Sequence, residues 1–164
     1  MKRNALLLAA VVVVAVALSA ISTTAQAYSG TSRAEQRVVW RVNDVRAHFG
    51  LAPLRASRGL TRAADHHSHD LLRHDFFDHD SSDGTTFDRR VHSYVGAYMV
   101  GENIAAVGTR HGVAALTVRL WMQSPPHREV LLTRGYRRIG VGRARGDLAG
   151  ARRTVITADF ASAR

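Results

Sequence analysis

Apolar residues recur with a helical period soon after residue 35. Val38, Val42, Val45 and Phe49 are separated by four, three and four positions, so they would share one face of a helix. Gly50 follows at once, and glycine commonly ends helices because it adopts left-handed backbone angles without strain. The pattern predicts an amphipathic helix that stops near residue 50.

A second helical pattern begins after Ser57, a residue type that favours the position just before the first turn. Charged residues occupy one side of this pattern, and a mostly apolar stripe occupies the other. The stripe consists of Leu60, Ala63, Ala64, His67 and Leu71. We expect the helix to run to about residue 74, with Phe76 and Phe77 packing inward after it. Turn-forming residues over 80–84 then place His79 on a loop.

Two shorter patterns, over 86–94 and 113–122, predict further helices. The pair Pro125-Pro126 ends the second of them, because proline lacks the amide hydrogen that continues a helix. Residues 51–54, between the first two helices, are expected to form an extended linker, since a residue that precedes proline avoids helical angles.

The C-terminal part of the chain has the composition of strands. Residues 138–142 and 154–160 predict two strands, and 145–152, with two glycines and an aspartate, predicts the hairpin loop between them. Residues 99–105 are the best candidate for a third strand. Helices first and strands last favour an α+β domain in which helices cover a small antiparallel sheet.

The N-terminus has the three parts of a secretory signal peptide. Two basic residues precede an apolar run over 5–20, and Ala25-Gln26-Ala27 has small residues at the positions required for cleavage. We expect a signal peptide at 1–27, a flexible N-terminus at 28–35 and one folded domain at 36–164. The alternative is an uncleaved membrane anchor, although the apolar run is slightly short for a span of about 20 residues.

Composition narrows the function classes. The chain has no cysteine, which excludes thiol nucleophiles, thiolate metal sites and disulfides. The net charge is +10, and Lys2 is the only lysine, so arginine carries the positive charge. The arginines are scattered and lack interleaved aromatic residues, so no nucleic-acid partner is expected. Mild contact with anionic polymers of the cell envelope is compatible with the charge.

Three short sequences carry residues of metal-ligand or acid–base type. They are 76–79 (Phe-Phe-Asp-His), 101–105 (Gly-Glu-Asn-Ile-Ala) and 121–128 (Trp-Met-Gln-Ser-Pro-Pro-His-Arg). Two later segments, Ile139-Gly140-Val141-Gly142 and Thr157-Ala158-Asp159-Phe160, follow in order. Each alone is weak, but the set resembles the bacterial secreted branch of the CAP superfamily, the SCP/PR-1-like domains.

The resemblance implies a three-layer α/β/α sandwich with a small antiparallel sheet flanked by helices. It also implies that His79, Glu102 and His127 lie in one cleft. Ser124 stands where many eukaryotic members carry a second glutamate, so one acid of their site is missing here. The family has no single agreed biochemistry, and the resemblance therefore predicts a site without predicting a reaction.

Two imidazoles and one carboxylate suit Zn²⁺, with water as the fourth ligand, so His79, Glu102 and His127 are the candidate metal ligands. The same side chains could instead hydrogen-bond one another. Ser124, His127 and Glu102 could form a hydrolase-like triad, although Ser124 is as readily explained as a helix-ending residue.

The helix after Ser57 is rich in histidine. His67 is expected in the core, where it would be hydrogen-bonded, because it lies on the apolar stripe. His66, His69 and His74 are expected in solvent, with a surface metal cluster as the alternative.

Three functions remain open for a secreted or envelope-associated protein with no transmembrane span after cleavage. The first is a binding module whose cleft holds a divalent metal, a small ligand or a peptide. The second is a zinc-dependent hydrolase of extracellular peptides or wall polymers, with Glu102 as third ligand or general base. The third is an adhesin that uses its basic surface on envelope polymers. Whether the protein is an enzyme stays undecided at this stage.

Overall fold

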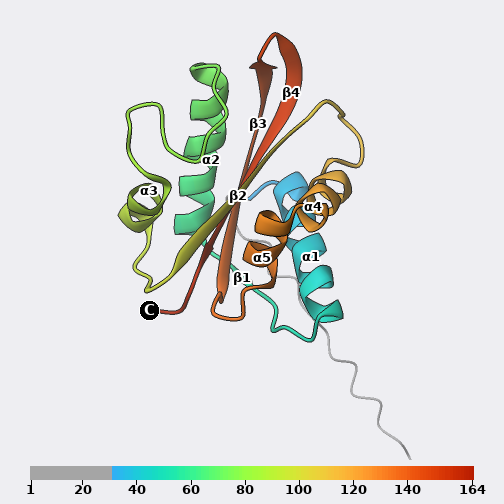
Figure 1. Cartoon of the computed structure of the whole chain (residues 1–164), viewed down its shortest axis with the longest axis vertical. Helices are drawn as coiled ribbons and strands as arrows, with labels where there is room; N and C mark the ends of the chain where they lie inside the picture. Colours follow the sequence, from blue (N-terminus) through green and yellow to red (C-terminus); the bar gives the residue numbers. More distant parts are fainter. Residues whose placement is uncertain (1–30) are drawn as a thin grey trace, which may run out of the picture.

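The computed structural model describes residues 31–164. The expected signal peptide, its cleavage site and residues 28–30 lie outside the described residues. The described part forms three layers, with helices on both faces of a sheet (Figure 1). The α/β/α sandwich expected from the sequence is therefore confirmed.

The sheet has the strand order β1-β3-β4-β2. Its centre is the antiparallel hairpin of β3 (Arg138–Leu148) and β4 (Ala151–Ala161). The turn between these strands is only Ala149 and Gly150, both with positive φ, the backbone that matches the twist of a tight hairpin. The prediction of a loop over 145–152 was wrong, because both strands continue to this turn.

Two strands flank the hairpin. β2 (Val100–Val107) pairs antiparallel with β4 at one edge of the sheet, which confirms the expected third strand. β1 (Arg55–Ala56) pairs parallel with β3 at the other edge. This short strand directly follows the extended linker and was not predicted.

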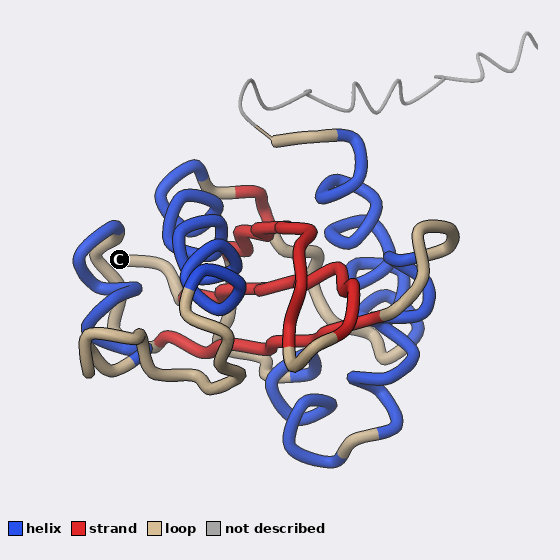
Figure 2. Tube along the Cα trace, turned by 90° about the horizontal axis from the view of Figure 1, so that it is seen from above, coloured by secondary structure: helices blue, strands red, loops and turns tan. Residues whose placement is uncertain are grey.

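The helices divide between the two faces of the sheet, as the view from above shows (Figure 2). α2 (Arg58–Arg73) and α3 (Phe87–Tyr94) cover one face. α1 (Arg33–His48), α4 (Val113–Gln123) and α5 (Pro125–Leu132) cover the other. A Cβ on Gly140 or Gly142 would lie 2.1–2.2 Å from backbone atoms of α2, so these glycines let the helix lie directly on β3.

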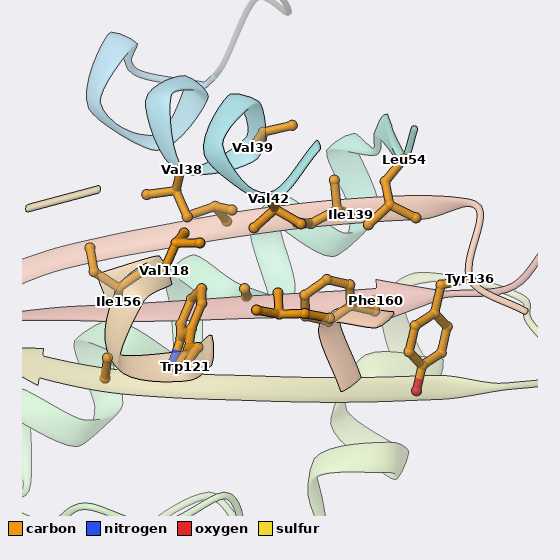
Figure 3. Packing of buried hydrophobic residues seen from close by; sticks show 14 residues of the cluster. Val38, Val39, Val42, Leu54, Val118, Trp121, Tyr136, Ile139, Ile156 and Phe160 are labelled. Carbon is orange, nitrogen blue, oxygen red and sulfur yellow. The ribbon is translucent and has the colours of Figure 1, made fainter. Parts of the chain in front are cut away.

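The main core fills the space between the sheet and α1, α4 and α5 (Figure 3). Trp121 is the largest fully buried side chain, and its indole Nε1 donates to the carbonyl of Ile104, 3.0 Å away. This bond ties α4 to the outer strand β2 and satisfies a carbonyl at the edge of the sheet.

Three local features differ from the sequence expectation. α1 begins at Arg33, inside the stretch expected to be flexible, because Ser32 and Glu35 form a capping box. α5 was missed, since Pro125 both follows α4 and occupies the first turn of a new helix, where its missing amide hydrogen is not needed. Phe77, expected to pack inward, is 48% exposed, whereas Phe76 does pack against the core.

Candidate functional site

The centre of the candidate site is Glu102, whose side chain is 1% exposed. It lies on β2, where successive side chains point to opposite faces of the sheet. Glu102 faces α2 and α3, and its neighbour Asn103 faces α5. Strand geometry therefore explains why the neighbouring residues Glu102 and Asn103 contribute to different layers.

Arg90 of α3 is the cationic partner of Glu102. Its Nη2 donates to Glu102 Oε2, and its Nη1 donates to the carbonyl of His79 (3.0 Å) and to Ser81 Oγ (2.9 Å). Arg90 is 4% exposed, so this is a buried ion pair that also holds the backbone of the loop carrying His79. A buried carboxylate requires such compensation, because transferring a bare charge out of water is very unfavourable.

His79 completes this cluster from the loop between α2 and α3. Its Nδ1 lies 2.8 Å from Glu102 Oε1, and its side chain is 46% exposed. The hydrogen bond that His79 donates to Glu102 raises the pKa of His79, and burial opposes that shift only in part. With Nδ1 used by Glu102, Nε2 is the ring nitrogen left for a ligand or metal.

His67 and Asp159 are two further titratable neighbours of Glu102. The Nε2 of His67 lies 3.0 Å from the carbonyl of Asp78 and 4.0 Å from Glu102 Oε1, and burial lowers the pKa of His67. Asp159 lies opposite Glu102 on β4 and is fully buried. Burial and the charge of Glu102 raise the pKa of Asp159 well above its usual value. The pKa values of these two carboxyl groups are therefore shifted in opposite directions, that of Glu102 down and that of Asp159 up.

The charge on Glu102 is fixed by its neighbours. Burial works to raise the pKa of Glu102, but the hydrogen bond from His79 and the charges of Arg90 and His67 outweigh it, so this pKa is lowered. Glu102 is consequently an ionised acceptor whose two oxygens are engaged by His79 and Arg90.

His127 lies in the first turn of α5, in the layer on the other side of β2. Its Nδ1 is 2.7 Å from Ser124 Oγ, and its carbonyl accepts from Asn103 Nδ2 at 3.0 Å. Burial, and then the positive charge of His79, lower the pKa of His127. The side-chain amide of Asn103 thus braces the backbone of α5.

The structure thus joins His79 to Glu102, and in the described part of the chain no hydrogen bond or ion pair joins His127 to either of them. Within residues 31–164, no group of three or more His, Asp or Glu side chains has a metal-ligating arrangement. The triad of Ser124, His127 and Glu102 is not assembled, since Glu102 is bonded to His79 and Arg90.

Several other expectations have clear outcomes. His67 is a buried core histidine, as predicted. Trp121 is buried as well, whereas Tyr98 is 91% exposed. Arg128 lies over the ring of Phe49, 5.2 Å from its centroid.

Sequence reasoning missed Arg90 and Asp159 as parts of the site. One signal was available: a glutamate expected in a buried strand needs a cation, and Arg90 adjoins the apolar Val91 in a short helix. For Asp159, the signal was its position inside the apolar strand 154–160.

Comparison with known proteins gives the family. The model of the cysteine-rich secretory protein family, CAP, matches residues 39–160, which include all the side chains of the site. The chain belongs to the CAP family. The α/β/α sandwich and the hydrogen-bonded pair of His79 and Glu102 therefore lie within a CAP domain.

Two proteins of Bacillus subtilis (strain 168) are similar in sequence to this chain. YkwD is 34% identical over 122 residues, which cover 74% of this chain and 46% of YkwD. The membrane protein YlbC is 34% identical over 109 residues, which cover 66% of this chain and 31% of YlbC. The chain thus spans less than half the length of each of these curated relatives.

Solved structures agree with this assignment. An extracellular protein containing an SCP domain from Bacillus anthracis str. Ames has a TM-score of 0.64 and 30% identity, with 79% of this chain and 40% of that chain covered. An outer surface protein of Borrelia burgdorferi has a TM-score of 0.67 at 20% identity, with 82% of this chain and 96% of that chain covered, and supports the fold. In the part of this CAP domain that the structure describes, no helix has the length and apolar character needed to cross a membrane.

Proposed function

We propose that this CAP domain is an extracellular binding module whose ligand-facing groups are the Nε2 atoms of His79 and His127. The observation that carries the proposal is the hydrogen bond between His79 Nδ1 and Glu102 Oε1. A buried carboxylate that fixes one ring nitrogen orients the other outward, which is the arrangement by which proteins prepare histidines to bind metals.

A divalent metal such as Zn²⁺ fits the donor atoms of the two histidines. His127 is held by Ser124 in the same way as His79 is held by Glu102, through Nδ1. Bound zinc would supply Lewis acidity and a bridge to a small ligand or peptide. Glu102 is better suited to orienting a histidine ligand than to binding the metal itself, since both of its oxygens already accept hydrogen bonds.

The hydrogen bonds that occupy Glu102 favour a binding function over hydrolysis. A general base must be free to take a proton and have a pKa near the working pH. Glu102 has a lowered pKa, and its two oxygens accept hydrogen bonds from Arg90 and His79. We therefore place the zinc-dependent hydrolase second, behind the binding module.

An extracellular location is part of the proposal. It is supported by the signal-peptide pattern of residues 1–27 and by the relatives described as an extracellular and an outer surface protein. Export tests this directly: expression in a bacterial host should release a chain that begins at Tyr28, and retention of the full-length chain in the cytoplasm would contradict it.

Zinc titration calorimetry tests the site. We expect one ion per wild-type chain, loss of that binding in His79→Ala/His127→Ala, and no change in the control His66→Ala/His69→Ala, whose histidines are exposed on α2. Equal binding by wild type and the site variant would reject the metal proposal. Binding lost only in the control would assign the metal to the surface of α2.

A further inference from the structure

A second candidate site lies in the opposite layer, between α1 and α4. A cavity of about 460 Å³ is bounded there by the N-terminal half of α1, the start of α4 and one residue of β3. α1 and α4 lie on the face away from α2 and α3 (Figure 1). The cavity is therefore separate from the cluster of Glu102 and His79.

The lining of this cavity is strongly basic. It contains Arg37 and Arg41 from α1, Arg110 from the loop before α4, and Arg143 from β3. The single acidic residue of the lining, Asp44, lies 4.0 Å from Arg41. Three guanidinium groups thus have no counter-charge in the lining.

These three groups are also free of other partners. Throughout residues 31–164, no hydrogen bond or ion pair engages the side chains of Arg37, Arg110 or Arg143, and the Nε of Arg143 is buried without a partner. Arg143 lies on the same side of β3 as Ile139 and Val141, so the strand directs it toward the helices that bound the cavity. A buried donor without an acceptor is unfavourable and indicates a place for an anionic group.

A contrasting cavity near the C-terminus shows that this is not a general property of the arginines. That cavity is also lined by arginines, but its Arg138 donates to the carbonyls of Gly96 and Ser162, and its Arg137 donates to the carbonyls of Arg134 and Tyr136. The guanidinium groups of Arg137 and Arg138 therefore support the fold. Those of Arg37, Arg110 and Arg143 do not.

Trp40 adds an aromatic surface to the basic cavity. It is 50% exposed, while the core face of α1 is formed by Val38 and Val42. Packing therefore does not account for its position. An exposed indole combines a flat apolar face with a polar edge, which suits contact with a sugar ring.

We propose that this cavity binds an anionic saccharide, with Trp40 against a sugar ring and Arg37, Arg110 and Arg143 on its carboxylate or phosphate groups. Guanidinium groups bind both kinds of oxyanion through paired hydrogen bonds. The volume lies in the range of small-ligand pockets and suits a few sugar rings. A single tryptophan at this cavity differs from the row of stacking aromatics that binds single-stranded nucleic acid.

Fluorescence offers a local readout for this site. The chain has two tryptophans, and Trp121 is 1% exposed, so ligand-dependent changes of emission report on Trp40. The probes are a hexamer of galacturonic acid, a phosphorylated maltohexaose, neutral maltohexaose and a hexamer of thymidylate. We expect saturable quenching by at least one acidic saccharide and weaker effects of the other two probes.

Matched variants distinguish binding at this cavity from attraction by the net charge of the protein. Arg37→Gln/Arg110→Gln should weaken binding of the acidic saccharide by about tenfold or more, the effect of losing about 1.4 kcal/mol of binding free energy. The control Arg89→Gln/Arg134→Gln removes the same charge from exposed positions outside the cavity and should change affinity by less than about twofold. Trp40→Ala, followed by calorimetry, should weaken binding as well.

Three results would overturn the proposal. Equal losses in the two double variants would mean attraction by net charge alone. Tighter binding of the thymidylate hexamer would assign the cavity to nucleic acid. Absence of saturable binding of either acidic saccharide would remove the site.

Discussion

Replacing Arg90 by methionine should destabilise the fold strongly and through Glu102. Arg90 is 4% exposed and the side chain of Glu102 is 1% exposed, so the substitution leaves a carboxylate buried without its cation. Three hydrogen bonds disappear with it: one to Glu102, one to Ser81 Oγ and one to the carbonyl of His79. Breaking one partner of a buried ion pair costs about 3–5 kcal/mol of unfolding free energy.

Urea unfolding followed by tryptophan emission measures this effect, with Arg89→Met as the control. Arg89 is the exposed neighbour of Arg90 in α3, and its loss should cost less than about 0.5 kcal/mol. The double variant Arg90→Met/Glu102→Gln removes both charges, so its destabilisation should be smaller than the sum of the single effects by about 1–3 kcal/mol. Additive single effects, or a cost for Arg90→Met below about 1 kcal/mol, would refute the central role of the pair.

Three further predictions follow from the same geometry. Asp159→Asn should stabilise the fold increasingly as pH rises above the ordinary aspartate pKa, because the raised pKa of Asp159 makes its contribution to stability fall until that raised pKa is reached. A difference in urea midpoint between variant and wild type that does not grow with pH would contradict this. Zinc affinity measured by calorimetry should fall as the pH decreases, and the fall should begin above the ordinary histidine pKa of about 6.5 because the pKa of His79 is raised. Glu102→Gln should move the fall in affinity to lower pH. Gly142→Ala should cost about 3 kcal/mol, because its Cβ would lie 2.2 Å from backbone atoms of α2, whereas Gly108→Ala meets only a flexible arginine and should cost far less in thermal unfolding.

The parts of the fold that could be predicted from sequence are those with one buried face. α1 and α2 have apolar stripes of helical period, and β2 and the inner halves of β3 and β4 are apolar. The outer end of the hairpin was read as a loop because its arginines and glycines lack a buried pattern. Leu148 is nevertheless buried in a cluster with Leu71 of α2, and the amide of Ala149 donates to Asp75 Oδ1. Contacts with α2 and the residue after its end therefore help to hold the outer end of the hairpin, and the pattern of the hairpin sequence alone does not show them.

The candidate site was predictable only in part, for a similar reason. His79 and Glu102 were identified through the family resemblance, and the structure joins them directly. Arg90 and Asp159 were missed, because the charge state and the partners of a buried ionisable side chain depend on neighbours from other elements. The register that sets Asp159 opposite Glu102 arises from strand pairing, which residue spacing along one chain does not specify.

The central claim is that Glu102 orients His79 so that its Nε2, together with that of His127, binds a metal. Nitrogen-15 NMR of the imidazole rings during zinc titration tests it most directly. The account predicts that zinc shifts the Nε2 signals of His79 and His127 while Nδ1 of His79 remains protonated on Glu102, and that Glu102→Gln weakens zinc binding by about 10–100-fold. Unchanged imidazole signals at saturating zinc, or coordination through Nδ1 of His79, would contradict it.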